Sequence, residues 1–264
     1  MKSVLYANNL NDFISQIKNN QNLHIVGGCT RIEDFPDKMI STFGISDLSN
    51  IMRHERYLDI GPGATLGKIL TISKNHIPPI LYDALISIAN PNIRNMATIG
   101  GNICSPGQKL TLFAPLSALD ARLEFKNEYE TIYEPIQNFT KVPDGFILSN
   151  IRVPFYVPEL SIFRRIGSEH EITQQSASFA FMADTERNSL IDVRLAFAGP
   201  FSFRSRQLES SIIGYRLPLS HKDISTIMQN VEKEFLSAST GIMISDVVTE
   251  QFLNLTHYSF EQLT

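Results

Sequence analysis

A glycine-rich segment in the middle of the chain, residues 92–104 (NIRNMATIGGNIC), places the strongest constraint on the fold. Its small residues Ala97, Gly100 and Gly101 leave space for a flat ligand, and we expect a loop over residues 97–103. Thr98 and Asn102 place uncharged hydrogen-bonding groups beside that space. The segment contains no grouping of carboxylates or histidines for a metal, and no nucleophile with a base beside it. This pattern is typical of a cofactor pocket.

A second glycine turn follows a short apolar strand over residues 23–26 and reads GGCT at residues 27–30. Paired glycines allow a positive φ and leave no β-carbon in the way, so successive N–H groups can converge on an anion such as a pyrophosphate. An ordinary tight turn is the alternative interpretation. The nearby sequence Gly61-Pro62-Gly63 resembles the start of a Rossmann motif, but Leu66 occupies the third glycine position, so that interpretation fails.

The remaining pattern predicts a mixture of helices and strands with a break between Pro154 and Pro158. A strand over residues 2–6, a helix over 9–18 and the strand over 23–26 form a compact α/β unit. We expect further helices at residues 66–73, 77–89, 110–119, 222–237 and 247–255. We expect further strands at residues 58–64 (breaking into a turn), 122–125, 131–133, 146–153, 161–165, 176–183 and 192–198.

Composition excludes several classes of protein. The chain has 264 residues, a net charge of −4 and 43% hydrophobic residues, with a pI of about 5.9. No segment concentrates Lys and Arg, no apolar run approaches the roughly 18 residues of a membrane span, and the N-terminus lacks a signal-peptide stretch. Two cysteines, Cys29 and Cys104, are too few for a disulfide framework or an iron–sulfur cluster. We therefore expect a cytoplasmic protein that binds neither nucleic acid nor membrane.

Residues 93–102 (IRNMATIGGN) closely resemble the "IRN-x-ATIGGN" signature of the FAD-binding medium subunits of molybdenum hydroxylases, which are xanthine dehydrogenase-like and carbon monoxide dehydrogenase-like enzymes. The resemblance extends over nearly the whole chain. It includes the segments 26–30, 59–65, 163–168, 196–200 and 245–247.

The resemblance implies the two-part FAD-binding fold of the vanillyl-alcohol oxidase (PCMH) type, followed by a C-terminal α+β domain with a small antiparallel sheet. The FAD-binding domain would cover residues 1–157, with subdomains of about 1–55 and 56–157, and the C-terminal domain would cover residues 158–264.

The family resemblance also implies a set of cofactor-binding residues. The pyrophosphate would be wrapped by Ile25, Val26, Gly27, Gly28, Cys29 and Thr30. The phosphates and the flavin would lie along Ala97, Thr98, Gly101 and Asn102, flanked by Ile88 and Ala89. Ile147 and Leu148 would be apolar contacts near the ring, and Arg164 would lie near its pyrimidine side.

Simpler roles are open for several of these residues. Arg164 is equally compatible with a solvated strand position, and Ile147 and Leu148 are expected in the core in either case. The two cysteines are expected to be buried thiols that behave as small apolar groups. His24 is expected to be a strand-edge residue and not a catalyst.

The chain departs from the family pattern at Thr111, where the family has an Asp that bonds the cofactor. The first loop also has Cys29 and Thr30 where the family favours Thr and Asp. Losing a charge-assisted hydrogen bond weakens an interaction by about 1.5–3 kcal/mol.

By resemblance, the chain would be one electron-transfer subunit of a larger enzyme and would be inactive on substrate by itself. Substrate would be oxidised at a molybdenum cofactor on a large partner subunit, and electrons would pass through iron–sulfur clusters on a small partner to non-covalent FAD here, then to NAD or another acceptor. Two alternatives are open. Thr111 suggests a flavin-free structural subunit, and a self-sufficient flavoenzyme of the same fold would need an acid or base for which the sequence offers no obvious candidate.

Overall fold

The computed structural model describes residues 2–20, 22–32, 34–168 and 171–263. The chain divides into two compact units. The first unit consists of Met1–Ile77, Ile88–Ser105 and Leu119–Phe155, and the second of Pro78–Ser87, Pro106–Ala118 and Tyr156–Thr264. Two short segments that precede residue 157 therefore pack in the second unit. The division into domains at residue 157 stays a prediction.

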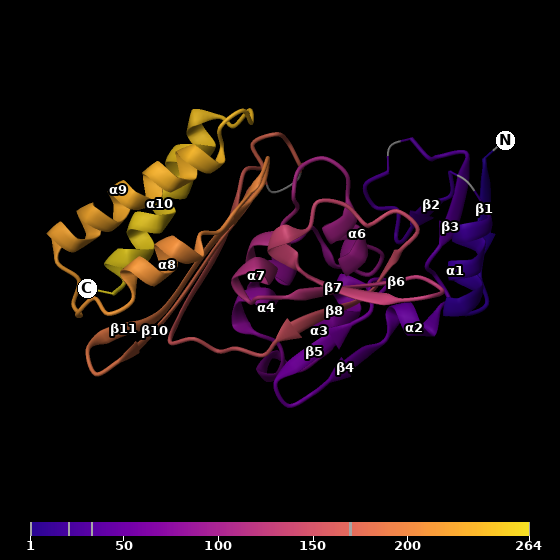
Figure 1. Ribbon diagram of the computed structural model, residues 1–264, viewed down its shortest axis with the longest axis horizontal. Helices are drawn as coiled ribbons and strands as arrows, with labels where there is room; N and C mark the ends of the chain where they lie inside the picture. The colour runs from indigo at the N-terminus through magenta and orange to yellow at the C-terminus, as the bar shows by residue number, and fades with distance from the viewer. Residues whose placement is uncertain (1, 21, 33, 169–170, 264) are drawn as a thin grey trace. The chain divides into compact units, whose positions relative to one another are not determined.

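The first unit begins with a small parallel sheet covered by a helix (Figure 1). Its strands lie in the order β1-β3-β2, so β2 is an edge strand and His24 is exposed at that edge, as expected. Helix α1 starts after Asn9, whose side chain accepts a hydrogen bond from the Asp12 N–H at 2.9 Å. It buries Phe13 and Ile14 in one cluster with Ile40 of β3. The elements are β1 (Ser3–Tyr6), α1 (Leu10–Asn19), β2 (His24–Val26) and β3 (Lys38–Ser41).

The first unit continues with a five-stranded antiparallel sheet in the order β4-β5-β8-β6-β7. Residues alternate between its faces: Leu58 and Ile60 are fully buried, whereas Asp59 between them pairs with Arg152 of β8. The elements are α2 (Ser46–Ser49), β4 (Ile51–Arg53), β5 (Tyr57–Ile60), α3 (Leu66–Leu70), η1 (Lys74–His76), α5 (Pro91–Arg94), α6 (Ile99–Cys104), β6 (Arg122–Lys126), β7 (Thr131–Pro135), η2 (Ile136–Asn138) and β8 (Ile147–Pro154).

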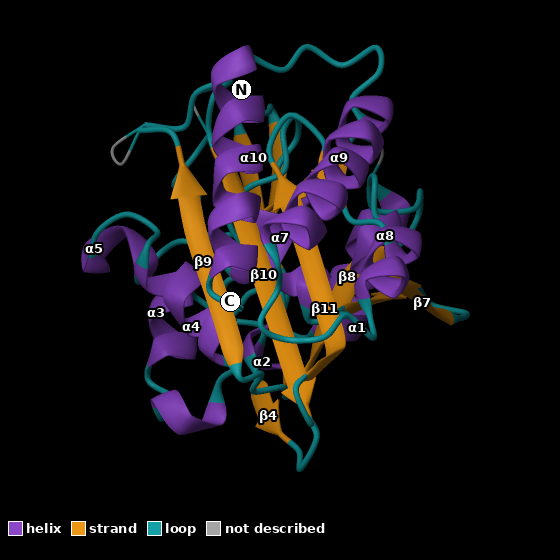
Figure 2. Cartoon of the chain, turned by 90° about the vertical axis from the view of Figure 1, so that its left-hand side faces the viewer, coloured by secondary structure: helices purple, strands orange, loops and turns teal. Residues whose placement is uncertain are grey.

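The second unit is built on a four-stranded antiparallel sheet in the order β12-β11-β10-β9. Helices α9 and α10 lie across one face of this sheet (Figure 2), and α4 and α7 contact its strands from the two segments that precede residue 119. The elements are α4 (Pro79–Ile86), α7 (Phe113–Ala118), β9 (Leu160–Ile166), β10 (Ala177–Glu186), β11 (Ser189–Ala198), β12 (Ser202–Phe203), α8 (Arg206–Ile212), α9 (His221–Ala238) and α10 (Asp246–Glu261).

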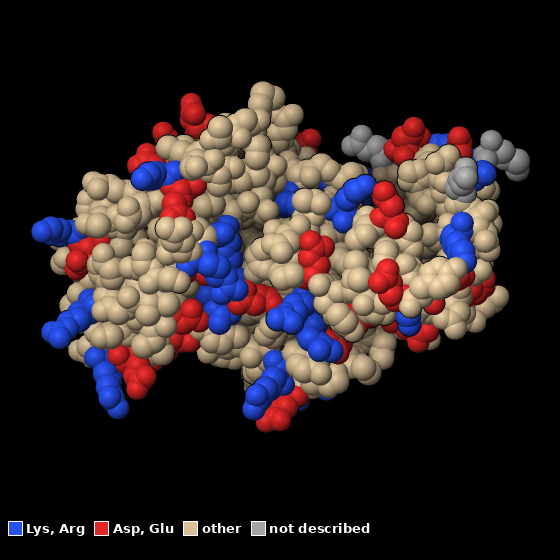
Figure 3. Space-filling model, in the orientation of Figure 1, with Lys and Arg blue, Asp and Glu red and all other residues tan. Residues whose placement is uncertain are grey.

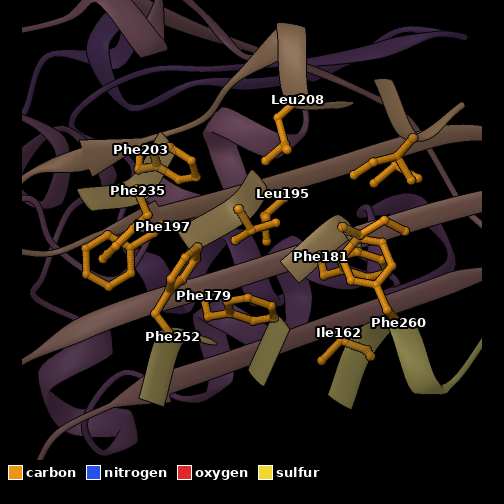
Figure 4. Close-up of a cluster of buried hydrophobic side chains, with 14 of the residues drawn as sticks. Ile162, Phe179, Phe181, Leu195, Phe197, Phe203, Leu208, Phe235, Phe252 and Phe260 are labelled. Atoms are coloured by element: carbon orange, nitrogen blue, oxygen red, sulfur yellow. The ribbon is translucent and has the colours of Figure 1, made fainter. Parts of the chain in front are cut away.

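Phenylalanine rings from both layers fill the core of the second unit (Figure 4). The rings of Phe235 and Phe252, on α9 and α10, are stacked with centroids 4.0 Å apart, and Phe197 of β11 meets each of them edge-on. Burying large aromatic side chains supplies most of the free energy that holds helices onto a sheet. One ion pair, Arg204–Glu209, is also buried here, with an Nε–Oε1 distance of 2.7 Å.

Two features of the helices and of the surface bear on what the chain can contact. Among the described residues, no helix combines the length and the apolar character that crossing a membrane requires. On the face drawn in Figure 3, basic and acidic side chains are interspersed.

Candidate cofactor site

The first glycine turn leaves the end of β2 at Val26. The neighbouring strand holds it in place, because the Thr42 N–H donates to the Val26 carbonyl oxygen at 2.9 Å. Cys29 has a φ of +53°, an unusual conformation for a residue with a side chain. The strand and its glycine turn thus form as expected, with the left-handed residue at Cys29 and not at a glycine.

The second glycine segment differs from expectation because residues 99–104 form helix α6 and not a loop. Thr98 caps the helix, and its Oγ1 accepts a hydrogen bond from the Gly101 N–H at 3.1 Å. Ile99 and Ile103 are buried on one side of α6. The cap and this burial outweigh the low helix propensity of the two glycines.

The two glycine segments are in direct contact. A β-carbon on Gly28 would lie 1.7 Å from the Met96 carbonyl oxygen, and one on Gly27 would lie 2.7 Å from Thr98 Oγ1. These distances are too short for any side chain, so both glycines are required for the two segments to approach each other.

A third turn, Gly61-Pro62-Gly63, packs against the second glycine segment. The Gly100 N–H donates to the Pro62 carbonyl oxygen at 2.8 Å, and a β-carbon on Gly100 would lie 2.6 Å from Pro62 Cβ. The prediction that Gly100 opens space for a ligand is therefore wrong: Gly100 is buried against Pro62. Leu66 further ties the segments together, since its N–H donates to the Ala97 carbonyl oxygen at 2.8 Å.

Two polar residues of the signature shape the backbone around the site. Arg94 Nη1 donates to the carbonyl oxygens of Ile88 and Ala89 at 2.8 and 2.6 Å. This holds the turn before α5, where Ala89 has a φ of +46°. Asn95 lies against Gly67, where a β-carbon would be 2.1 Å from the Asn95 Oδ1 atom. Both residues act on neighbouring backbone, a role that the sequence analysis did not assign.

The surface formed by the two segments fits an anionic, flat group. Gly101 is exposed, and the only atom near a β-carbon built on it is Thr98 Oγ1 at 3.0 Å, so the space above this turn is open. Residues 27–30 and 97–104 include no carboxylate. Backbone N–H groups without nearby negative charge suit a pyrophosphate. The Cys29 thiol adds no charge, because burial raises its pKa.

The other residues predicted for the site are distributed over both units. In the first unit, Ile25 is exposed, Asn102 and Ile88 are half-buried, and Ile147 and Leu148 are buried core residues as expected. In the second unit, Thr111 is half-buried and Arg164 is exposed on β9. The two cysteines are half-buried and not buried as expected, because Cys29 lies in a surface turn and Cys104 at the end of a short helix.

One residue near the loops was missed altogether. Arg31 directly follows the first glycine turn, and its Nη1 donates to Ser105 Oγ at 3.1 Å, at the end of α6. The signal available in the sequence was a basic residue next to a predicted anion-binding turn.

The sequence of the chain is similar to sequences of known proteins. Residues 1–156 match the model of a family described as "FAD binding domain in molybdopterin dehydrogenase". The xanthine dehydrogenase FAD-binding subunit of Escherichia coli O157:H7 is 25% identical over 255 residues, covering 89% of this chain and 86% of that protein. The glyceraldehyde dehydrogenase medium chain of Sulfolobus acidocaldarius is 23% identical over 195 residues, covering 69% and 68%.

Solved structures show the same fold. Reconstituted CO dehydrogenase from Oligotropha carboxidovorans superposes with a TM-score of 0.79 at 16% identity, covering 100% of this chain and 96% of that chain. Quinoline 2-oxidoreductase from Pseudomonas putida 86 gives a TM-score of 0.78 at 15% identity, covering 100% and 95%. The α+β fold class expected from the sequence is confirmed.

Proposed function

Because the chain belongs to the family of FAD-binding domains in molybdopterin dehydrogenases, we propose that it binds FAD non-covalently and transfers electrons within a larger molybdenum-containing oxidoreductase. The observation that carries this proposal is the contact between the two glycine segments. Gly28 against Met96 and Gly27 against Thr98 bring two turns free of carboxylates together at one surface.

The chain's own residues would bind and orient the cofactor. In the proposal, backbone N–H groups of residues 27–30 hold the pyrophosphate, whereas those of Gly100 and Gly101 are already bonded to Pro62 and Thr98. Thr98 and Asn102 supply uncharged hydrogen-bonding groups, and Arg164 supplies a cation for the pyrimidine side of the ring. Bound FAD accepts electrons singly and releases them in pairs, and the protein's part is to orient the ring and to set its electrostatic environment.

The proposal assigns the metal centres to partner chains. The relatives are named as an FAD-binding subunit and a medium chain, which are words for one part of a multi-chain enzyme. We propose a large partner with the molybdenum cofactor, a small partner with iron–sulfur clusters, and NAD or another molecule as the acceptor. Among the described residues, no three His, Cys, Asp or Glu side chains are grouped to hold a metal.

Affinity purification tests the proposed assembly. A tagged full-length chain is recovered from extract of its native source, and its partners are identified by mass spectrometry with flavin and metal analysis. Recovery of a molybdenum-containing large subunit and a cysteine-rich small subunit is expected. A chain that recovers neither, and that oxidises a small organic substrate alone, would contradict the proposal and favour a self-sufficient flavoenzyme.

A flavin-free structural subunit is the second candidate, and Thr111 favours it. In the second unit Thr111 lines a small cavity of about 10 Å³ together with Arg165 and Ser176. A hydroxyl here cannot supply the charge-assisted bond of a carboxylate, which is worth about 1.5–3 kcal/mol. An assembled complex that contains this chain but no FAD would support this candidate.

A further inference from the structure

We propose that Arg31 is a direct ligand of the cofactor's pyrophosphate and supplies the positive charge that the two glycine segments lack. This inference rests on the proposed function, because it assumes that FAD lies along those segments. It assigns a charged contact to a residue outside both turns.

The position of Arg31 is set by both segments. It follows residues 27–30 directly in the chain, and its Nη1–Ser105 Oγ hydrogen bond of 3.1 Å connects it to the end of α6. Ser105 directly follows α6, whose first turn carries the exposed Gly101. The guanidinium therefore lies at the end of this helix, in contact with the second segment and adjacent in the chain to the first.

No carboxylate of the two glycine segments offsets the charge of Arg31, and of the acidic residues that follow it in the chain, Glu33 and Asp34, Asp34 pairs with Lys2 at 2.8 Å. Neither turn includes a carboxylate, and Ser105 is uncharged. Within the part of the chain that the structure describes, Arg31 forms no ion pair, and its side-chain hydrogen bond is the one to Ser105. By contrast, Lys2 and Lys18 of the same unit each pair with a carboxylate at 2.8 and 2.6 Å.

The chemistry of the side chain suits a phosphate. A guanidinium has five N–H donors in a planar fork, so a single bond to Ser105 leaves donors for phosphate oxygens. Guanidinium–phosphate bonds are charge-assisted and commonly bidentate. Arg31 is exposed, so a ligand can reach it without a rearrangement of the core. The ligand chemistry is that of a nucleoside diphosphate, of which FAD is one example.

The alternative role for Arg31 is purely structural: it would only link the two segments through its hydrogen bond to Ser105. The experiment has to distinguish this role from binding of the pyrophosphate. Ser105→Ala removes the hydrogen bond between the segments and keeps the positive charge of Arg31. Arg31→Ala removes both the hydrogen bond and the charge. Arg31→Lys keeps a positive charge without the planar guanidinium. The affinities of the full-length apoprotein and these three variants for FAD are measured by titration. ADP is used as a competitor that carries the diphosphate without the flavin. Titrations are repeated between about 50 mM and about 500 mM NaCl, a range over which exposed charge pairs become screened.

If Arg31 binds the pyrophosphate, Arg31→Ala lowers the affinity for FAD about ten- to a hundred-fold. ADP competition weakens in parallel, and the affinity of this variant depends less on salt than that of the wild type. Arg31→Lys retains part of the affinity, and Ser105→Ala changes it far less than Arg31→Ala.

Two results would overturn the inference while the proposed function stands. One is unchanged FAD affinity in Arg31→Ala, and the other is an equal loss in Arg31→Ala and Ser105→Ala with the salt dependence of the wild type. Failure of the folded wild-type chain to bind FAD would be a different outcome, because it removes the proposed function and the inference together.

Discussion

Gly28 lies against the backbone of Met96 so closely that a β-carbon on Gly28 would be 1.7 Å from the Met96 carbonyl oxygen. The two residues are 68 positions apart in the sequence (96 − 28). This contact joins the turn after the parallel sheet to the segment that leads into α6. The geometry of the proposed FAD site therefore depends on Gly28, which allows the two segments to pack closely.

Replacing Gly28 by Ala is expected to destabilise the first unit. The methyl group must displace backbone, because the atom it meets is a carbonyl oxygen, and overpacking of this kind costs about 1–3 kcal/mol. The free energy of unfolding of the full chain, measured by urea titration, is expected to fall by that amount. Gly101→Ala is the matched control, since its β-carbon meets only Thr98 Oγ1 at 3.0 Å. Equal stability of Gly28→Ala and wild type would show that the two segments do not touch in this way.

Replacing Gly101 by Val is expected to abolish FAD binding and to leave the fold largely intact. The position is exposed on the first turn of α6, so the branched side chain extends into the space proposed for the cofactor. FAD titration, with circular dichroism as the control for folding, measures both effects. Unchanged FAD affinity would show that this turn does not line the site.

The Asp59–Arg152 pair is expected to make the stability of the first unit depend on pH. Arg152 donates to both carboxylate oxygens of Asp59, at 2.8 and 2.9 Å. Burial raises the pKa of Asp59, but hydrogen bonds from Arg152 and Asn150 outweigh it, and the pKa lies below its usual value. The pair therefore stabilises the fold above the unfolded-state pKa of about 3.9, and this stabilisation is lost as pH falls through the lowered folded-state pKa.

Asp59→Asn tests this dependence. At pH 6 the variant is expected to be less stable than wild type by about 1–3 kcal/mol, and the difference should shrink as the pH is lowered below 4. Urea unfolding across this pH range provides the measurement. Asp144→Asn is the control, because that carboxylate is 91% exposed in its pair with Lys141. A difference that stays constant with pH would rule out the proposed role of the Asp59 charge.

Glu209→Gln is expected to destabilise the second unit strongly. Glu209 accepts hydrogen bonds from Arg204 Nε at 2.7 Å and from the Leu195 N–H at 3.0 Å, and both charged side chains are almost fully buried. Removing one charge of a buried pair leaves the other uncompensated, which costs about 3–5 kcal/mol. Thermal unfolding should show the loss. Glu186→Gln, on a 63% exposed side chain, should change little. A Glu209→Gln variant as stable as that control would contradict the assigned pairing.

Much of the fold was predictable from local pattern. The helix predicted over residues 9–18 and the strand before Gly27 follow from the spacing of apolar residues, and the structure has both. The long helices α9 and α10 and the strands β9 to β11 were predicted for the same reason. Several short elements were missed, among them β3, β4 and α8, which have three to seven residues.

The structure of the candidate site could be predicted only in part, because it depends on contacts between residues that are distant in the sequence. Residues 97–103 were predicted as a loop because several of them are small, yet Thr98 and the burial of Ile99 stabilise α6. The packing of Gly100 on Pro62 joins residues far apart in the chain, and no local pattern contains that information. The position of Arg31 next to the first glycine turn was visible in the sequence, but its contact with Ser105, 74 residues later, was not.

The most direct test of the proposed function is whether the isolated chain binds FAD. The purified full-length protein is precipitated with acid, and the released cofactor is identified by chromatography against FAD and FMN standards. If the protein is colourless, it is first incubated with FAD at about tens of micromolar, which fills a site weakened about a hundred-fold from an affinity of about 0.1 μM or better. A yellow protein that releases FAD and no FMN is expected. A folded protein that stays colourless after this incubation would contradict the proposed function.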